Sequence, residues 1–310
     1  MRVIVVGLGI QGRKRLAVAG SEAVATVDPV APGADHKAIE DVPLEAYDAA
    51  LVCTPDEPKE RLLAYLLEHG KHVLVEKPLL ARSSETLRHL ALIAERTGTV
   101  CYTAYNHRFE PHLASVKQLL DDGAIGTVYQ ARFFYGNGTA RDVRSSPWRD
   151  SGLGVISDLA SHLLDLVLFF FGQPSGDPQV WAQERFENQA CDYFMVGFPD
   201  TRPMLKLEGT LLSWRNSFLL DIVGEKGSIH VNGLCKWGPS SLIVRRRILP
   251  SGKPDEEVRT LEQKDPTWAL EYAHFNYVCA RGAGGNIAND IYINEAFQRI
   301  AAQLGLKMLA

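Results

Sequence analysis

The chain has 310 residues, a net charge of −4, and 46% hydrophobic and 23% charged residues. This length predicts two globular domains, and the slight acidic excess argues against a nucleic-acid partner. The five cysteines show no CxxC spacing, which argues against a disulfide framework or a zinc site and fits the reducing cytoplasm. No apolar run is long enough to span a bilayer, so no membrane partner is expected.

Apolar, β-branched runs recur along the first third of the chain, and helix patterns fill the intervals between them. The first helix pattern covers 10–19, Asp56 is placed to cap the second, and Ser83 or Ser84 opens the third. This alternation predicts right-handed βαβ units and a parallel sheet with helices on both faces. The runs that predict buried strands are 2–6, 23–27, 49–53, 72–75 and 100–104.

The pattern becomes less regular after about residue 120. Apolar residues alternate with others at 194–198 and at 218–222, which is typical of strands that bury one face. Two helix patterns follow, near 267–281 and 291–304. We therefore predict an α/β Rossmann domain with a parallel sheet, followed by an α+β domain with an antiparallel sheet. The predicted domains cover residues 1–119 and 120–310.

Residues Gly7 to Gly12 form a G-x-G-x-x-G pattern that follows a predicted strand and opens a predicted helix. In this context Gly7 permits a tight turn, Gly9 lets a pyrophosphate approach the backbone, and Gly12 lets helix and strand pack closely. The amide groups and the dipole at the helix N-terminus favour phosphates. A glycine-rich loop without a ligand is the alternative. The context of the pattern predicts dinucleotide binding.

Asp28 ends the second predicted strand, about 20 residues after the first glycine, where an acidic residue accepts hydrogen bonds from the adenosine ribose. This carboxylate would repel a 2′-phosphate, and no arginine follows closely. We therefore expect NAD(H) in preference to NADP(H). The residues expected to contact the cofactor are Gly7, Gly9, Ile10, Gln11, Gly12, Asp28, Thr54, Pro55, Glu76 and Lys77.

The tripeptide Glu76-Lys77-Pro78 follows the predicted strand 72–75. Ligands of open α/β sheets lie beyond the carboxyl ends of the strands, so Lys77 is expected beside the nicotinamide end of the cofactor. An ammonium group there could donate a hydrogen bond to the oxygen that reacts. The alternative is a surface lysine in a loop.

Asp158, His162 and Asp165 are spaced i, i+4 and i+7, so a regular α-helix would place all three on one face. The rest of this helix pattern is apolar and predicts burial, and buried polar groups need partners or a cavity. A histidine beside a carboxylate is a good general acid or base for an alcohol proton. A structural histidine and a zinc site are the alternatives. Because no further Cys or His cluster is visible, we predict no metal.

Two further segments carry side chains that suit a substrate. The segment 105–109 follows the last strand of the first domain, and the loop 141–149 precedes the Asp158 helix. Arginines and an aromatic ring suit a phosphate or carboxylate and a stacked ring, although a solvated loop explains the same residues. The residues predicted to bind substrate are Asn106, Arg108, Trp148, Arg149, Asp158 and His162.

The sequence resembles the Gfo/Idh/MocA family over most of its length. The glycine pattern, Glu76-Lys77-Pro78, and the segments 106–111 and 152–165 come in the order and spacing of that family. The resemblance implies a Rossmann domain followed by an open-faced, mostly antiparallel sheet. In the family this sheet often forms the oligomer interface, so a homodimer or homotetramer is expected.

The resemblance also implies oxidation or reduction of a sugar or cyclitol carbon. Carried over by position, Lys77 and His162 are the proton-handling pair, and Asp158 binds substrate or orients the histidine. Three positions depart from the family pattern without removing these groups: Lys59 in place of a frequent His, Leu153 within a glycine triplet, and Ala160 in place of Gly. These departures concern cofactor contacts and pocket shape, and therefore the substrate.

The combined features predict an NAD-dependent dehydrogenase or reductase that acts on a secondary alcohol or ketone of a sugar, nucleotide-linked or free. Two alternatives stay open. A redox-assisted, NAD-dependent glycosidase would release a sugar without net use of NAD. A non-catalytic dinucleotide-binding sensor would bind the cofactor without turnover, although a sensor has no need of a proton-transfer pair.

Overall fold

The computed structural model describes residues 1–147 and 149–308 and divides the chain into two compact units. The first unit comprises Met1–Asn106 and Thr267–Asn294, and the second comprises His107–Pro266 and the residues from Glu295 onward. The division therefore falls after residue 106, whereas the sequence predicted a boundary after residue 119. It is also discontinuous, because the chain returns to the first unit after the second sheet is complete.

A five-stranded, fully parallel sheet forms the centre of the first unit, in the order β2-β1-β3-β4-β5. Most of its residues are Val, Ile, Leu and Ala buried on both faces, as expected for a parallel sheet covered by helices. The predicted strands and their parallel arrangement are confirmed. The strands are β1 (Val3–Val6), β2 (Ala23–Val27), β3 (Ala49–Val52), β4 (His72–Glu76) and β5 (Cys101–Ala104).

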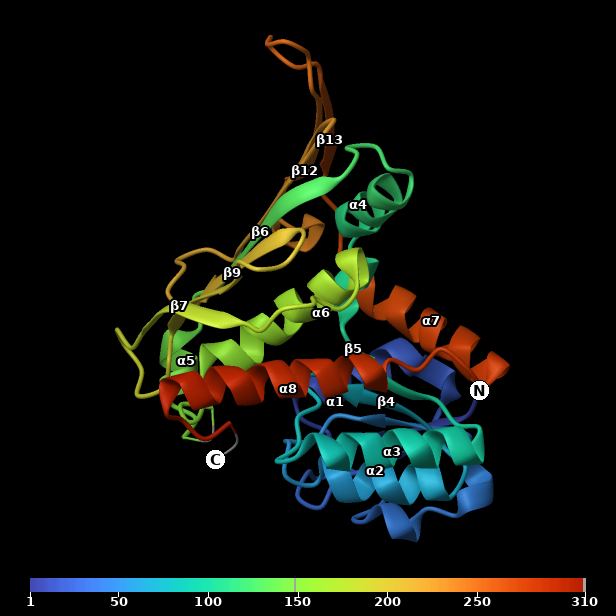
Figure 1. Cartoon of the computed structure of the whole chain (residues 1–310). Helices are drawn as coiled ribbons and strands as arrows, with labels where there is room; N and C mark the ends of the chain where they lie inside the picture. The colour runs from blue at the N-terminus through green and yellow to red at the C-terminus, as the bar shows by residue number, and fades with distance from the viewer. Residues whose placement is uncertain (148, 309–310) are drawn as a thin grey trace. The chain divides into compact units, whose positions relative to one another are not determined.

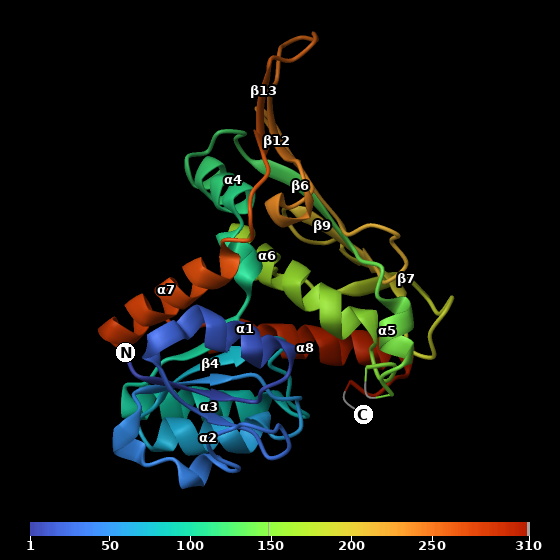
Figure 2. The same ribbon diagram turned by 180° about the vertical axis from the view of Figure 1, so that it is seen from behind.

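Helices cover both faces of this sheet (Figures 1 and 2). They are α1 (Ile10–Ala19), α2 (Lys59–Glu68), α3 (Ser84–Thr97), α7 (Thr267–Arg281) and α8 (Ile287–Leu304), which continues into the second unit. Leucines of α2 and α3 pack on one face of the sheet. Leu16 of α1 and Tyr272 and Phe275 of α7 pack on the other face. The unit is thus a three-layer α/β/α sandwich.

The predicted helix caps are right for α3 and wrong for α2. The Ser83 hydroxyl accepts a hydrogen bond from the amide of Glu85 (3.2 Å), as expected for an N-cap. Pro58, with no side-chain cap, occupies the N-cap position of α2 where Asp56 was expected to act. The Asp56 carboxylate instead accepts a hydrogen bond from the ammonium group of Lys59 (2.7 Å), a charged donor at the same helix end.

The segment 286–294 belongs to the first unit because it completes the edge of the parallel sheet. The Asn286 amide accepts a hydrogen bond from the backbone N–H of Thr103 (2.6 Å) and donates one to its carbonyl (2.8 Å). It thereby takes the place of the next strand beside β5. In contrast, the Glu110 carboxylate accepts a hydrogen bond from the amide of Cys235 (3.1 Å), so the chain is fixed to the second unit soon after residue 106.

An eight-stranded sheet forms the second unit, in the order β13-β12-β11-β10-β6-β9-β8-β7. All neighbours are antiparallel except β6 and β9, which confirms the prediction of a mostly antiparallel sheet. Burial alternates along the central strands, so one face forms the core. The strands are β6 (Val128–Gly136), β7 (Gln179–Glu184), β8 (Tyr193–Phe198), β9 (Met204–Thr210), β10 (Ser217–Gly224), β11 (Gly227–Asn232), β12 (Ser240–Arg246) and β13 (Glu256–Leu261).

Helices α4 (Pro111–Asp121) and α6 (Ser161–Phe171) lie along one face of this sheet, and α5 (Ala140–Arg144) is short (Figures 1 and 2). The residues before α6 are not a regular α-helix as the sequence predicted, because Ile156–Ala160 form a π-helical segment. Hydrophobic spacing carries no signal that distinguishes such a segment from an α-helix. π-Helical turns are rare and occur frequently at functional sites.

All five cysteines are free thiols, and burial raises the pKa of each, to about 11 for Cys191 and Cys235. In the part of the chain that the structure describes, helices cover both faces of the parallel sheet, whereas α4 and α6 lie along one face of the eight-stranded sheet. Among the described residues, no helix combines the length and the apolar character needed to cross a membrane.

Candidate functional site

The glycine-rich turn joins β1 to α1 at the point where the strand order of the parallel sheet reverses. Gly7 adopts φ +91°, and its amide donates a hydrogen bond to the carbonyl of Val27 (2.8 Å), which ties the turn to β2. A Cβ on Gly12 would lie 1.7 Å from the Gly7 carbonyl oxygen, so this approach of helix to strand requires glycine. Helix α1 begins without a side-chain cap and without an acidic residue in its first turn. Its first amide groups can therefore bind an anion.

The surroundings of this turn fit a dinucleotide. Gly9 is exposed, and a Cβ built on it would meet nothing within 4 Å, so the backbone is open to a close ligand. The hydroxyl oxygen of Thr54 is buried beside Gly7 with no hydrogen-bond partner among the described residues. Buried hydroxyls are normally hydrogen-bonded, so a ligand at this turn would complete the site. The predicted contacts Ile10, Gln11 and Pro55 are exposed around it.

Asp28 organises the loop that follows β2. Its carboxylate accepts hydrogen bonds from the amides of Leu8 (2.7 Å), Val30 (2.8 Å) and Ala31 (2.7 Å). Partial burial would raise the pKa of Asp28, but these three donors more than offset it and hold the pKa below its usual value. The carboxylate therefore stays ionised near neutral pH, directly beside the glycine-rich turn.

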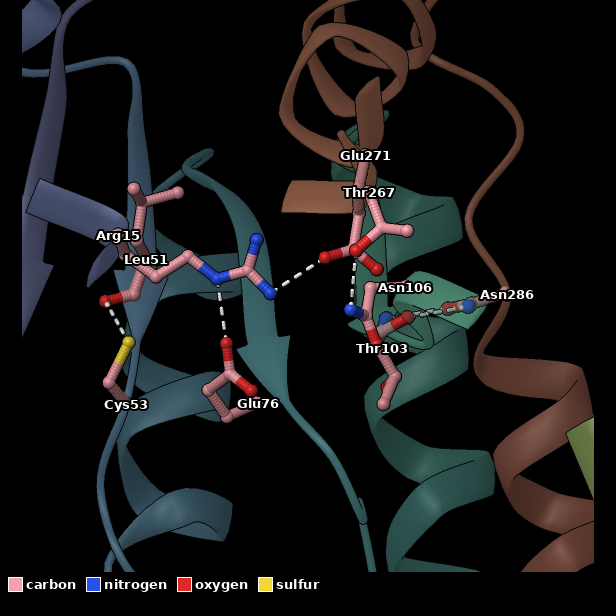
Figure 3. Close-up of polar contacts among 9 residues, drawn as sticks. All are labelled: Arg15, Leu51, Cys53, Glu76, Thr103, Asn106, Thr267, Glu271 and Asn286. Carbon is pink, nitrogen blue, oxygen red and sulfur yellow. Dashed lines mark hydrogen bonds and ion pairs between the residues drawn. The ribbon is translucent and has the colours of Figure 1, made fainter. Parts of the chain in front are cut away.

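A buried guanidinium joins three elements at the carboxyl end of β4 (Figure 3). Arg15 of α1 is 1% exposed, and its Nε donates a hydrogen bond to Glu76 at the end of β4 (2.6 Å). Its Nη2 donates to Glu271 of α7 (2.7 Å), and the guanidinium lies over the Trp268 ring, 4.2 Å from the ring centre. Burial would lower the pKa of Arg15, but the two carboxylates raise it above its ordinary value. The Arg15 side chain therefore stays protonated and positively charged.

A second buried cation lies on the other side of Lys77. Lys59 is 3% exposed, and its ammonium group donates hydrogen bonds to the Pro78 carbonyl (2.7 Å) and to the Asp56 carboxylate (2.7 Å). The neighbours of Lys77 on both sides are thus bonded to cations, whereas Lys77 is partly exposed. This placement at the strand ends matches the position expected for a ligand-contacting lysine.

In the second unit, the predicted histidine and carboxylate lie where the π-helical segment meets α6. Asp158 is in the π-helical segment, and His162 is 7% exposed near the start of α6. The His162 ring stacks on that of His107, with ring centres 4.1 Å apart and planes inclined by 21°. The Tyr135 ring of β6 lies 5.9 Å from His162 and 5.3 Å from His107. Burial and the charge of Asp158 both raise the pKa of Tyr135, so the phenol keeps its proton.

Two arginine–carboxylate pairs flank these rings. Arg149 lies 3.7 Å from the Asp158 carboxylate, and both side chains are about one-third exposed. Arg108 binds Asp165 through two hydrogen bonds of 2.7 and 2.5 Å. Asp165 is fully buried; burial raises its pKa, and the guanidinium offsets only part of that rise. The structure thus brings Arg149 to Asp158, and it commits two donors of Arg108 to a structural ion pair.

Asn106 and Trp148 complete the residues predicted to bind substrate. The Asn106 side chain is 8% exposed and donates a hydrogen bond to the Thr267 hydroxyl (2.7 Å), next to two places where the chain passes between the units (Figure 3). Trp148 lies outside the described residues. None of these contacts tests substrate binding, which stays a prediction for all of the residues named.

Sequence reasoning missed three residues beside the site. Arg15 looks like an ordinary solvated helix residue, and its two carboxylate partners are 61 and 256 residues away. His107 lies in the segment 105–109, in which only Asn106 and Arg108 were predicted to bind substrate. Tyr135 alternates with Phe133 along β6, a pattern that indicates an inward-facing residue without indicating its contact with a histidine.

A metal site has no counterpart in the part of the chain that the structure describes. Over residues 1–147 and 149–308, no group of three His, Cys, Asp or Glu side chains is placed to hold a metal ion.

The parallel sheet and its glycine-rich turn give the first unit the fold of a dinucleotide-binding domain. Residues 1–105 match the model of the oxidoreductase family with an NAD-binding Rossmann fold, and residues 113–230 match that of the GFO/IDH/MocA C-terminal domain. The two matches together cover well over half of the chain. The chain belongs to the Gfo/Idh/MocA family.

Individual relatives agree with this assignment. The uncharacterized oxidoreductase YdgJ of Escherichia coli (strain K12) is 32% identical over 194 residues, which are 60% of this chain and 54% of that protein. The scyllo-inositol 2-dehydrogenase (NAD(+)) of Bacillus subtilis (strain 168) is 27% identical over 329 residues, 94% of this chain and 89% of that protein. The chain spans about half or less of the length of the first curated relatives it matches.

A solved structure shows the same fold. The levoglucosan dehydrogenase in complex with NADH has a TM-score of 0.78 against this chain, at 22% identity. The superposition covers 98% of this chain and 97% of that one. The likeness therefore extends through both units.

The two glycines Gly9 and Gly12 should respond differently to a single methyl group. Gly9→Ala should fold as well as the parent, because its Cβ meets no atom, but should weaken NADH binding about tenfold or more by blocking the pyrophosphate. Gly12→Ala should lower the free energy of unfolding by about 1–3 kcal/mol, because its Cβ overlaps the Gly7 carbonyl. Thermal unfolding and NADH fluorescence titration measure the two effects. Undiminished NADH binding by Gly9→Ala would contradict the assigned cofactor turn.

Proposed function

We propose that the chain is a reversible, NAD-dependent dehydrogenase that interconverts a secondary alcohol and a ketone on a sugar or cyclitol. The observation that carries the proposal is the presence, in one chain, of a dinucleotide-type turn with Lys77 at the end of β4 and a buried His162 beside Asp158. A relative named for oxidation of scyllo-inositol supports the choice of a polyhydroxylated ring.

Oxidation of a secondary alcohol removes a hydride from the carbon and a proton from the oxygen, and the proposed residues assist these two transfers. Bound NAD supplies the acceptor for the hydride that leaves the alcohol carbon. His162 accepts the hydroxyl proton as that hydride leaves, and Lys77 donates a hydrogen bond to the oxygen that becomes the ketone. Asp158 accepts a hydrogen bond from a neighbouring hydroxyl or orients the histidine. The reverse reaction returns the proton from His162.

Residues near Asp158 and His162 in space or in sequence would determine which substrate binds. Arg149 lies beside Asp158 and is about one-third exposed, so it can bind an anionic group such as the phosphate of a nucleotide-linked sugar. Arg108 would act through the segment that carries His107, because Asp165 already binds two of its donors. Asn106 and Trp148 stay in the proposed set on their sequence positions alone.

The cofactor preference follows from Asp28. An ionised carboxylate beside the glycine-rich turn accepts hydrogen bonds from ribose hydroxyls and repels a 2′-phosphate. The wild-type protein should therefore bind NADH about tenfold or more tightly than NADPH, and Asp28→Ser should narrow this ratio. Titration by nicotinamide fluorescence measures both affinities, with thermal unfolding as a control for the loop amides that Asp28 binds.

Equal affinity for the two cofactors would reject the preference for NAD. If neither bound, a denatured sample should be examined for released NAD, because trapped cofactor would also prevent binding. Absence of released cofactor would then reject the dinucleotide site itself.

A second copy of the chain is the proposed partner of the outer face of the eight-stranded sheet. Leu219 pairs with Phe134 and Ile243 pairs with Val258 across neighbouring strands, on the face opposite the buried one. Trp181 packs over Gly197 on that face and is 43% exposed. Such apolar side chains favour association into a homodimer or homotetramer.

Sedimentation equilibrium should give a mass of two or four chains for the parent protein. Leu219→Asp should lower this mass, and a monomeric parent would reject the interface.

The proposed proton-handling pair can be tested by substitution. Lys77→Ala and His162→Ala should each lower kcat by about 10²- to 10⁴-fold, because each removes a group that acts in the transition state. The NADH affinity should change little, and Lys264→Ala, at an exposed position of the second unit, should behave as the parent. A screen of sugars, cyclitols and nucleotide sugars with NADH detection supplies the substrate.

Two other outcomes would redirect the assignment. Full activity of either alanine variant would remove that residue from the mechanism. Release of a sugar without accumulation of NADH would identify a redox-assisted glycosidase, and tight cofactor binding without turnover on the whole panel would favour a sensor.

A further inference from the structure

The segment that carries Lys77 is held from two sides by buried cations. On one side, Arg15 Nε binds the Glu76 carboxylate at 2.6 Å. On the other side, the Lys59 ammonium group binds the Pro78 carbonyl at 2.7 Å. The residues immediately before and after Lys77 are therefore each fixed by a charge-assisted hydrogen bond, which is roughly twice as strong as a neutral one.

The two cations belong to different helices, and each has a carboxylate partner of its own. Arg15 belongs to α1, and its guanidinium is fixed by Glu271 of α7 (2.7 Å) and by the face of the Trp268 ring. Lys59 is the first residue of α2 and is fixed by Asp56 (2.7 Å). Residues of two helices on opposite faces of the sheet thus bind the tripeptide, and α7 supports one of them through Glu271.

The two cations and the lysine between them differ in exposure. Arg15 and Lys59 are 1% and 3% exposed, whereas Lys77 is only partly buried. A lysine has a flexible four-carbon stem, so the location of its ammonium group depends on how firmly the backbone at its Cα is held. A displacement of about 1 Å at a reacting group can cost about 10²-fold in rate.

We propose that Arg15 and Lys59 are positioning residues for Lys77, which hold the Glu76-Lys77-Pro78 turn so that the Lys77 ammonium group reaches the reacting oxygen. The proposal rests on the role given to Lys77 under the proposed function. It assigns to two residues of the glycine-turn helix and of α2 a role that neither cofactor binding nor core packing requires.

The decisive measurement is the rate at which Lys77 is acetylated by the N-hydroxysuccinimide ester of acetic acid, read by peptide mass spectrometry on the intact protein. Lys59→Met should raise the Lys77 rate about tenfold, because it removes one charged hydrogen bond from the turn. Lys59→Arg should restore most of the parent behaviour. Lys71→Met is the matched control, since the Lys71 ammonium group also binds a carbonyl of the first unit, that of Tyr47 (2.9 Å), away from the tripeptide.

Turnover of the substrate found in the screen provides the second readout. Lys59→Met should lower kcat by about 10- to 100-fold with little change in NADH affinity, and should have no further effect in the Lys77→Ala background. Arg15→Lys, which keeps the charge and loses the planar fork, should act in the same direction and serves if Lys59→Met does not fold.

Different results would reject the positioning role of Arg15 and Lys59 and the catalytic role of Lys77. Parent-like acetylation of Lys77 in both Lys59→Met and Arg15→Lys would overturn the positioning role, whatever Lys77 does in catalysis. An equal loss of kcat on Lys59→Met with and without Lys77 would assign the effect to general stability and would also overturn it. Full activity of Lys77→Ala would reject the proposed function, while the acetylation rates would still report whether the turn is held.

Discussion

The burial of the Arg15 guanidinium is the interaction on which the first unit depends. Moving such an ion from water into a low-dielectric interior costs on the order of 20 kcal/mol in an idealised estimate, and several kcal/mol after relaxation. Glu76 and Glu271 offset this cost from two directions, and Trp268 covers the face of the cation. Loss of one partner from a buried pair typically costs about 3–5 kcal/mol, so α7 is tied to the first unit although the second sheet precedes it in the sequence.

An ion pair also fixes a segment of the second unit, with one carboxylate in place of two. Arg108 and the buried Asp165 fix the short helical turn that contains His107 against α6, and His107 in turn stacks on His162. In both units an arginine–carboxylate pair is therefore close in sequence to a group assigned to chemistry: Glu76 directly precedes Lys77, and Asp165 follows His162 by three residues. Ionic geometry is directional, whereas hydrophobic packing is not, so such pairs define the orientation of a segment better than a leucine contact would.

Local patterns in the sequence predicted the elements of the first unit closely. The spans 10–19, 23–27 and 267–281 coincide with α1, β2 and α7. The glycine-rich turn, the lysine after β4 and the histidine near the start of α6 were also found from residue type and position. Each of these features can be recognised within a short stretch of sequence.

The remaining features could not be recognised from short stretches of sequence. The return of residues 267–294 to the first unit joins segments that are far apart in the sequence. The π-helical segment before His162 has the composition of an α-helix. Arg15 was missed because arginine is usually solvated, and the carboxylates that bury it come from distant segments. The cap expected from Asp56 failed because Lys59 competes for the same carboxylate.

The discontinuous first unit has a consequence for the order in which the protein is made. Arg15 and Glu271 are 256 residues apart, so at about 5–20 residues per second the ribosome delivers α7 roughly 10–50 s after α1. During that interval the face of the parallel sheet that Tyr272, Phe275 and Val278 later cover stays accessible to solvent. The nascent chain therefore presents an apolar surface until α7 has been synthesised, which makes the first unit a target for chaperones or proteases before it can retain a cofactor.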